Sequence, residues 1–186
     1  MTDFPLPADL PAPQDDGRAD HLPGRELPAL ELVGTDQNTV ALAHLGPGRT
    51  IIYIYPMTGR PGVDLPAGWD EIPGARGCTP ESCAFRDHHS ELVAAGAGQV
   101  YGLSSQDTGY QREVADRLHL PFALLADPDL ALAGALDLPT FETGGVRRYS
   151  RLTLIASEGR IEHVFYPVFP PDGHALEVLT WLHEHA

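Results

Sequence analysis

Residues 50–56 read TIIYIYP, and this short run decides the fold. Every side chain from Thr50 to Tyr55 is apolar, aromatic or β-branched, with no alternation of charged positions. Such a composition is typical of a strand inside a sheet that is covered on both faces. Pro56 ends the run, because proline cannot donate a hydrogen bond to a neighbouring strand. The run therefore predicts a central strand at 50–55.

Strand and helix signals alternate on both sides of this run. A polar turn at 35–38 predicts an N-terminal β-hairpin from its two flanking apolar segments, 30–33 and 39–42. The later segments alternate between strand and helix, as expected for an α/β chain, and they cover 99–103, 108–118, 122–125 and 130–136.

The end of the chain carries two further signals. A turn at 157–159 predicts a second hairpin, formed by residues 149–155 and 160–165. Asp172 is expected to cap a closing helix that runs through Trp181. The pattern as a whole predicts an α/β fold.

The only two cysteines, Cys78 and Cys83, lie in the run GCTPESCAFRD at 77–87. Thr79 and Pro80 are typical of a helix start, and the apolar spacing that follows predicts a helix to about residue 95. Cys78 would then lie at the positive end of the helix dipole, which favours a thiolate. We therefore expect the Cys78 thiol to ionise easily.

The spacing of the two cysteines limits how they can pair. Residues five apart in an ideal helix have Cα atoms about 8 to 9 Å apart, on different sides of the helix. This separation exceeds the ~7 Å limit for a disulfide. A disulfide between Cys78 and Cys83 therefore requires the helix to unwind.

Two segments are rich in turn formers. Residues 57–77 contain many Gly and Pro residues and predict a long loop, a feature that is usually functional or disordered in a compact domain. Residues 1–26 hold five prolines and lack the pattern of a signal peptide, so we interpret them as an N-terminal arm. The remaining residues, 27–186, are expected to form a single domain.

Composition excludes several functions. The net charge of −14 argues against nucleic-acid or anionic-membrane partners, which require concentrated positive charge. All twelve basic residues are arginine, which excludes a P-loop lysine, a pyridoxal Schiff base and a lysine general base. Two cysteines this close suggest a redox or metal pair in a reducing compartment, so we expect a cytoplasmic protein.

The cysteine run resembles a known family when it is taken with its surroundings. It resembles the peroxiredoxin Q group, also called bacterioferritin comigratory proteins, which has the same elements in the same order. These elements are a strand ending in Tyr55-Pro56, the run at 77–87, and a second block with RLTLI at 151–155, GRIEHVF at 159–165 and a terminal Trp-Leu. The resemblance covers the chain from about residue 27 to its end.

The resemblance implies a thioredoxin-like fold, with a central mixed sheet flanked by helices. It implies that Cys78 is the peroxidatic cysteine, which forms a sulfenic acid, and that Cys83 resolves it as an intramolecular disulfide, the atypical 2-Cys type. Arg151 would favour the thiolate and bind the oxygen that gains charge. The resemblance also implies peroxide as substrate and an external dithiol such as thioredoxin as reductant. No cofactor or metal is expected, and a resolving cysteine in the same chain suits a monomer or weak dimer.

The chain departs from the family upstream of the cysteine. The family has a Pro and a Thr shortly before it, with the Thr three positions upstream, where this chain has Ala75. Pro56 lies more than twenty residues before Cys78. We therefore predict that residues 57–77 are an insertion folded as a flap over the pocket, and that Pro56 and Thr58 are the displaced site residues.

Other interpretations remain open from the sequence. A thiol-disulfide oxidoreductase or a redox-switched binding protein of the same fold is the main alternative, although the usual Cys-x-x-Cys pair is missing. A zinc site with His88 or His89 lacks the usual ligand spacing. A cysteine hydrolase would have no local motif. Arg151 could serve only as an ion-pair partner, and Glu81 could complement the helix dipole or orient Arg151.

Overall fold

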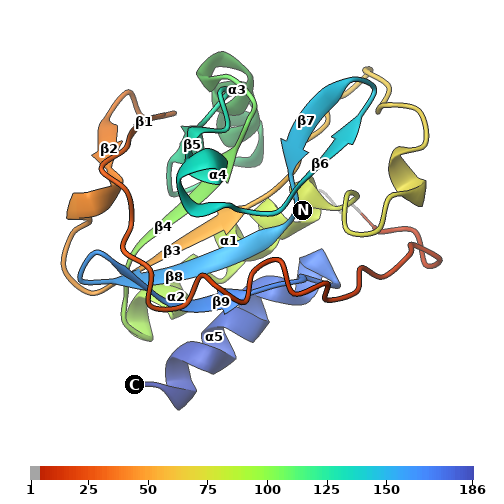
Figure 1. The fold of residues 1–186 in the computed structure, drawn as a ribbon. Coiled ribbons are helices and arrows are strands. Elements are labelled where there is room, and N and C mark those ends of the chain that lie inside the picture. The colour runs from red at the N-terminus through yellow and green to blue at the C-terminus, as the bar shows by residue number, and fades with distance from the viewer. Residues whose placement is uncertain (1–4) are drawn as a thin grey trace.

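Residues 5–186 are described by the computed structural model, and they build a mixed sheet with helices against both faces (Figure 1). The seven strands of this sheet run in the order β2-β1-β5-β4-β3-β8-β9. Their bounds are β1 (Glu31–Gly34), β2 (Thr39–Ala41), β3 (Arg49–Ile54), β4 (Ala97–Ser104), β5 (Leu124–Ala126), β8 (Leu152–Ser157) and β9 (Arg160–Phe165). A separate two-stranded sheet consists of β6 (Thr140–Thr143) and β7 (Val146–Tyr149).

Within residues 5–186, five α-helices and three short 3-10 helices complete the fold. The α-helices are α1 (Cys78–Asp87), α2 (His89–Ala94), α3 (Thr108–Leu118), α4 (Ala131–Leu136) and α5 (His174–Glu184) among the described residues. The 3-10 helices are η1 (Leu42–His44), η2 (Trp69–Glu71) and η3 (Pro171–Gly173). No helix in this part of the chain has the length and apolar character needed to cross a bilayer.

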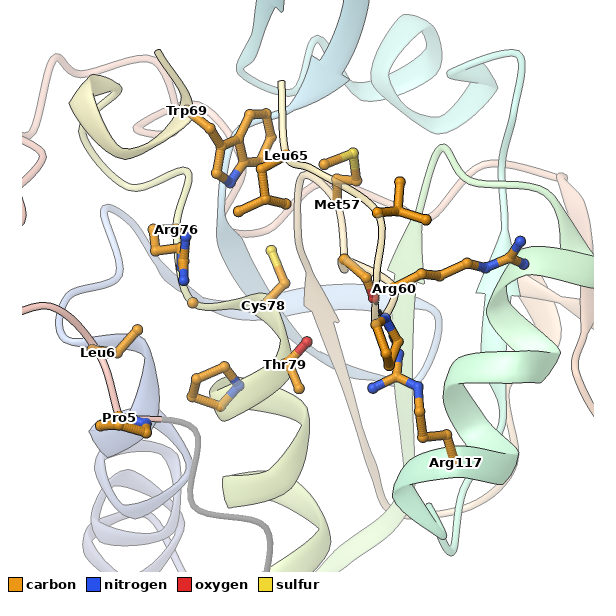
Figure 2. Close-up of a pocket in the computed structure, with 15 residues that line it drawn as sticks. Pro5, Leu6, Met57, Arg60, Leu65, Trp69, Arg76, Cys78, Thr79 and Arg117 are labelled. Atoms are coloured by element: carbon orange, nitrogen blue, oxygen red, sulfur yellow. Dashed lines mark hydrogen bonds between the residues drawn. The ribbon is translucent and has the colours of Figure 1, made fainter. Parts of the chain in front are cut away.

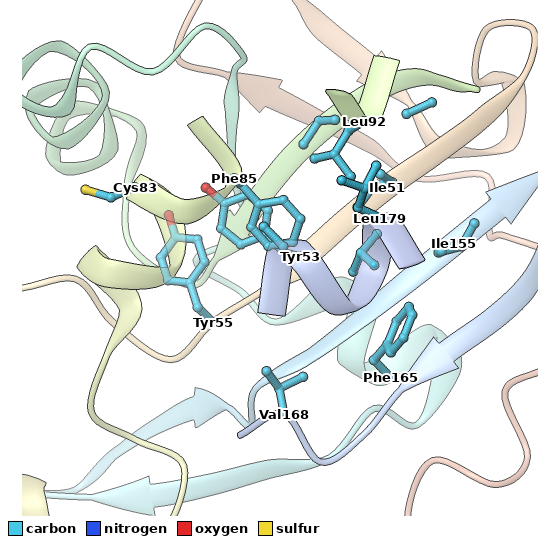
Figure 3. Packing of buried hydrophobic residues seen from close by; sticks show 14 of the residues in the cluster. Ile51, Tyr53, Tyr55, Cys83, Phe85, Leu92, Ile155, Phe165, Val168 and Leu179 are labelled. Carbon is cyan, nitrogen blue, oxygen red and sulfur yellow. The ribbon is translucent and has the colours of Figure 1, made fainter. Parts of the chain in front are cut away.

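Strand β3 is the central element, as its composition predicts. It pairs in parallel with β4 and antiparallel with β8, so the sheet is mixed. Ile51 and Tyr53 face a cluster that includes Phe85 of α1, while Ile52 and Ile54 face a second cluster on the other side of the sheet. Figure 3 shows the ring of Tyr53 stacked on that of Phe85, with centroids 4.4 Å apart. The predicted α/β class, mixed sheet and N-terminal hairpin are confirmed.

The N-terminal arm packs along the edge of the sheet. Gly24 and Arg25 of the arm form backbone hydrogen bonds with Ile161 of β9, and Leu22 is fully buried in the second cluster. Figure 1 shows the arm running across the β8–β9 side of the molecule. Of the arm, residues 1–4 lie outside the described residues.

Three local predictions were wrong. The helix expected from Pro80 to about residue 95 starts at Cys78 and breaks at His88, whose backbone leaves the helical region, so α1 and α2 are separate. Asp172 does not cap the last helix: it lies within η3, and α5 follows Gly173 without a side-chain cap. Tyr149 belongs to β7, so the second hairpin starts only at Leu152.

The β6–β7 hairpin was not predicted from the sequence. The two strands join through Gly144 and Gly145, both at positive φ. A Gly-Gly pair between two short runs with β-branched and aromatic residues is a signal for a tight hairpin turn. The hairpin packs against the loop at 57–77, because Phe141 contacts Trp69 with ring centroids 6.0 Å apart.

Candidate active site

Cys78 is the first residue of α1, and Gly77 makes this position possible. Gly77 has φ 110°, a conformation that other residues rarely adopt, and a Cβ there would lie 2.4 Å from Pro171. The Cys78 side chain is 2% exposed. Its sulfur points into a pocket beneath Leu65 and Trp69, as Figure 2 shows.

The Arg151 guanidinium binds the Cys78 thiol, the Glu81 carboxylate and the end of the 57–77 loop. Its Nη2 donates to Cys78 Sγ at 3.2 Å, and its Nη1 donates to the carboxylate of Glu81, about one helical turn further along α1. The same guanidinium donates to the backbone oxygens of Gly74, at 3.3 Å, and Ala75, at 3.1 Å. The structure therefore brings Cys78, Arg151 and Glu81 together, and it attaches the end of the 57–77 loop to the same group.

Electrostatics around the thiol are dominated by burial. Burial raises the pKa of Cys78, while the Arg151 guanidinium opposes this by favouring the thiolate. Glu81 raises the pKa further, and a hydrogen bond from the Met57 backbone N–H lowers it. The expectation that the helix start alone makes Cys78 ionise easily is wrong for this closed pocket. Ionisation depends instead on Arg151.

Glu81 is a buried carboxylate held near Arg151 and His174. Burial raises its pKa, and Arg151 and then His174 oppose this shift. One carboxylate oxygen accepts from Arg151, whereas Oε1 has no hydrogen-bond partner among the described residues. His174, which the sequence analysis did not identify, is buried, and its Nε2 lies 2.8 Å from the Thr153 hydroxyl. A histidine in an amphipathic helix carries no sequence signal for this contact.

Thr58 is buried, but its hydroxyl binds another residue. Its hydroxyl and its backbone N–H both donate to Gln106 Oε1, at 3.1 and 3.0 Å, and Tyr110 donates to its carbonyl at 2.8 Å. Thr58 therefore anchors the loop to the β4–α3 connection, two residues after the buried Pro56. Met57, between Pro56 and Thr58, lines the same pocket as Cys78, and its backbone lowers the pKa of the thiol.

Cys83 lies about one and a half turns after Cys78 in the same continuous helix. It is 9% exposed, and Figure 3 shows it at the edge of the core cluster, pointing away from the rings of Tyr53 and Phe85. Burial raises its pKa, and Arg86 lowers it. Both cysteines are free thiols.

The pocket above Cys78 has a volume of about 460 Å³. The 57–77 loop forms much of its wall, with Met57, Leu65 and Trp69 on the Cys78 side. Trp69 is 3% exposed, and it packs this wall against the β6–β7 hairpin through its contact with Phe141. Within residues 5–186, no group of three or more His, Cys, Asp or Glu side chains is arranged to hold a metal ion.

The chain is similar to known proteins of one family. The family model described as Redoxin matches residues 22–179. The chain is 31% identical to peroxiredoxin Bcp of Escherichia coli (strain K12), over 88% of this chain and 96% of that protein. The chain is a peroxiredoxin of the Q/Bcp group. It is also 27% identical to chloroplastic peroxiredoxin Q of Populus jackii, over 86% of this peroxiredoxin and 67% of the plant protein.

Solved structures agree with this assignment. The fold of this peroxiredoxin matches peroxidoxin BcpB of Mycobacterium tuberculosis with a TM-score of 0.71 and 22% identity, over 89% and 99% of the two chains. It matches peroxiredoxin Q of Xanthomonas campestris with a TM-score of 0.65 and 28% identity, over 87% and 97%. The resemblance and the thioredoxin-like fold are thus confirmed. Membership of this group makes the chain a thiol peroxidase.

Proposed function

We propose that this peroxiredoxin reduces hydrogen peroxide or organic hydroperoxides through Cys78, that Cys83 resolves the product as an intramolecular disulfide, and that an external dithiol such as thioredoxin restores both thiols. The observation that carries this proposal is the 3.2 Å contact between Arg151 and the Cys78 sulfur at the floor of a pocket. The guanidinium stays charged at any working pH, so it can stabilise both the thiolate and the leaving oxygen.

The first step consumes one peroxide. The Cys78 thiolate attacks the nearer oxygen of the O–O bond, that bond breaks, and the other oxygen leaves as an alkoxide or hydroxide that takes up a proton. Cys78 becomes a sulfenic acid while the peroxide becomes an alcohol or water. Arg151 lies where it can donate to the oxygen that gains charge, which is the transition-state interaction that accelerates such a displacement.

The second step joins the two cysteines. The Cys83 thiolate attacks the Cys78 sulfur, a disulfide forms, the S–O bond breaks, and the oxygen leaves as hydroxide, which takes up a proton to become water. Both cysteines lie in one helix, so α1 must unwind at its first turns before the sulfurs can meet. The loop end held by Arg151 through Gly74 and Ala75 must then rearrange as well. We expect the reduced and oxidised proteins to differ mainly here.

One experiment tests the proposed sequence of steps. One equivalent of hydrogen peroxide is mixed with the reduced protein, and samples are quenched on the millisecond scale for intact-mass measurement. A rapid loss of two hydrogens, with no added oxygen, is expected for the wild type. A wild-type rate no faster than that of a small free thiol would contradict the enzyme proposal.

Cys83→Ser separates the two steps. Without a resolving thiol, the variant should gain one oxygen at close to the wild-type rate and then a second one with excess peroxide, because a sulfenic acid that has no partner is oxidised further. The measurement is the same quenched intact mass, with a sulfenic acid trap added. If the variant instead turned over peroxide with the external dithiol at the wild-type rate and without over-oxidation, Cys83 would not be needed to resolve the sulfenic acid.

Thr58 remains a proposed site residue, with a positioning role. Thr58→Val removes the hydroxyl bond to Gln106 and should lower the peroxide rate about threefold to tenfold, because the neighbouring Met57, which lines the pocket with Cys78 and whose backbone favours the thiolate, is held less firmly. A positioning role also predicts a higher apparent pKa for Cys78, measured by the pH dependence of alkylation. Thr58→Ser should restore both values, and an unchanged rate in Thr58→Val would remove Thr58 from the site.

The burial of Cys78 argues against a role as a general thiol-disulfide oxidoreductase. A protein disulfide must meet the attacking sulfur directly, and a cysteine that is 2% exposed in a pocket is reachable only by a small molecule until α1 unwinds. A peroxide is small enough to reach Cys78 through this pocket. This burial therefore supports the peroxidase proposal over the oxidoreductase alternative.

A further inference from the structure

We propose that His174 is a positioning residue for the peroxidase reaction: it supplies a second buried positive charge that keeps the Glu81 carboxylate ionised, so that Glu81 holds Arg151 on the Cys78 sulfur. The inference rests on the proposed function and adds a residue to it. His174 does not line the pocket above Cys78, so it would act through other residues and not on the peroxide itself.

The buried charges near the thiol do not balance without a second cation. When Cys78 ionises, its thiolate and the Glu81 carboxylate are two negative charges beside one guanidinium, that of Arg151. A buried charge is costly unless it is paired. Among residues 5–186, Arg151 and His174 are the only basic side chains that are buried. In this part of the chain, His174 is therefore the one buried group that can supply the missing charge.

The fold places His174 against the two elements that carry the site. It is the first residue of α5, and its ring meets the ring of Phe85 edge-on, with centroids 5.7 Å apart. Phe85 lies four residues after Glu81, so both side chains share one face of α1. On β8, Thr153 binds Nε2 of His174 at 2.8 Å and lies two residues after Arg151, on the same side of the sheet. His174 thus lies in the layer that holds the Arg151 and Glu81 pair.

The hydrogen bonds of His174 suit a protonated ring. Nδ1 lies 2.8 Å from Glu177 Oε2, and this bond lowers the pKa of Glu177. An ionised carboxylate only accepts, so Nδ1 carries a hydrogen. The Thr153 hydroxyl can donate or accept, so Nε2 can gain a proton without losing its partner. The start of a helix disfavours a positive charge, and Glu177 in the first turn of α5 offsets this effect.

Glu81 is the group that requires this charge. Burial raises its pKa, and Arg151 and then His174 oppose the shift. Its Oε1 has no hydrogen-bond partner within the described residues. A carboxylate with so little solvation takes up a proton unless nearby positive charge prevents it. A neutral Glu81 would hold Arg151 less firmly, because hydrogen bonds between two charged groups are roughly twice as strong as neutral ones.

Other titratable groups around His174 do not replace its charge. His163 of β9 interacts with Glu177, but burial lowers the pKa of His163, so it carries less charge than an ordinary histidine. Tyr53 of β3 lies beside β8, and burial raises its pKa well above the usual value, so its hydroxyl stays neutral. Asp172 of η3 is exposed and acidic. None of these three side chains provides a buried positive charge.

The test compares His174→Gln with the wild type over a range of pH. The second-order rate of Cys78 oxidation by hydrogen peroxide is measured in single turnover on the reduced full-length protein, by quenched intact mass. A histidine gains its charge as the pH falls, and without that charge Glu81 is protonated at a higher pH. The variant-to-wild-type ratio of rates should therefore be about threefold to tenfold lower at about pH 6 than at about pH 8.5. Taking the ratio cancels the loss of thiolate that both proteins share.

Further variants separate charge from packing. In a Glu81→Gln background, His174→Gln should give a ratio that does not depend on pH, because no carboxylate is left to protonate. Thr153→Val offers no oxygen to a protonated Nε2 and should shift the ratio in the same direction by about twofold or more, whereas Thr153→Ser should restore it. His89→Gln is the matched control, because His89 is half-buried on α2 and does not line the pocket. It should leave the wild-type pH profile in place.

The outcomes distinguish this inference from the proposed function. A His174→Gln ratio that stays constant over the pH range, or the same pH dependence in the Glu81→Gln background, would overturn the role of His174 while peroxidase activity stands. If His174→Gln does not fold, Glu177→Gln at an exposed side chain takes its place; it should show the same trend by about twofold, and a constant ratio would overturn the inference. Failure of the wild type to react rapidly with hydrogen peroxide at any pH would instead remove the proposed function itself.

Discussion

Cys78→Ser should lose peroxide turnover by about 10⁴-fold or more, which is the scale seen when a catalytic nucleophile is removed. A serine hydroxyl is not ionised near neutral pH, and the burial that already raises the pKa of the Cys78 thiol would disfavour an alkoxide further. The change removes only the sulfur at the first position of α1, so the fold should persist. The measurement is turnover with hydrogen peroxide and an external dithiol, followed by intact mass after peroxide treatment.

Cys83→Ser is the matched control for this prediction, because it also exchanges a sulfur for an oxygen in the same helix. It should still take up oxygen from the first peroxide, whereas Cys78→Ser should show only slow oxidation of scattered side chains. A circular dichroism spectrum like that of the wild type would confirm that α1 is intact. If Cys78→Ser kept more than about a tenth of the wild-type rate, Cys78 would not be the peroxidatic residue.

Arg151→Gln is expected to lower the rate with peroxide by about 10²- to 10³-fold, the typical effect of losing a preorganised donor to a developing oxyanion. Arg151 also opposes the effect of burial on the Cys78 thiol, so its loss should raise the pKa of Cys78 further. The thiolate forms above that pKa, so the rise of rate with pH should move to higher pH. The pH dependence of iodoacetamide alkylation measures this shift directly.

The same variant should lose stability, because the buried Glu81 carboxylate is left without its main partner. Breaking a buried ion pair from one side typically costs about 3 to 5 kcal/mol. Glu81→Gln combined with Arg151→Gln should recover most of the free energy of unfolding but not the activity. Stability is measured by urea denaturation, which keeps the structural effect apart from the chemical one.

A second arginine provides the control for charge removal alone. Arg49 pairs with Glu162 across the edge of the sheet at 2.6 Å, with both side chains partly exposed. Arg49→Gln should change stability by only about 0 to 1 kcal/mol and leave the pH profile of Cys78 alkylation in place. An Arg151→Gln profile that coincides with the wild-type profile would mean that Arg151 does not tune the thiol.

Much of the fold could be predicted because the composition of its central strand is distinctive. A run of apolar residues at 50–55 needs cover on both sides, and the alternating segments around it can supply that cover only as an α/β sheet. The hairpin at β6–β7 was missed although Gly144 and Gly145 mark its turn. The ends of α1 also differ from the predicted helix, because the backbone conformations of Gly77 and His88 decide where it starts and stops.

The sequence by itself determined the family, the central strand and the pair Cys78 and Cys83, since these depend on local composition and spacing. Only the tertiary structure decided the environment of the thiol: residues 73 positions apart, Cys78 and Arg151, meet at 3.2 Å, and Thr58 turns to Gln106. Burial also raises the pKa of the Cys78 thiol, whereas its place at the helix start predicted easy ionisation. The physical reason is that solvation and electrostatic contacts depend on which distant segments pack together, and spacing along the chain does not encode that.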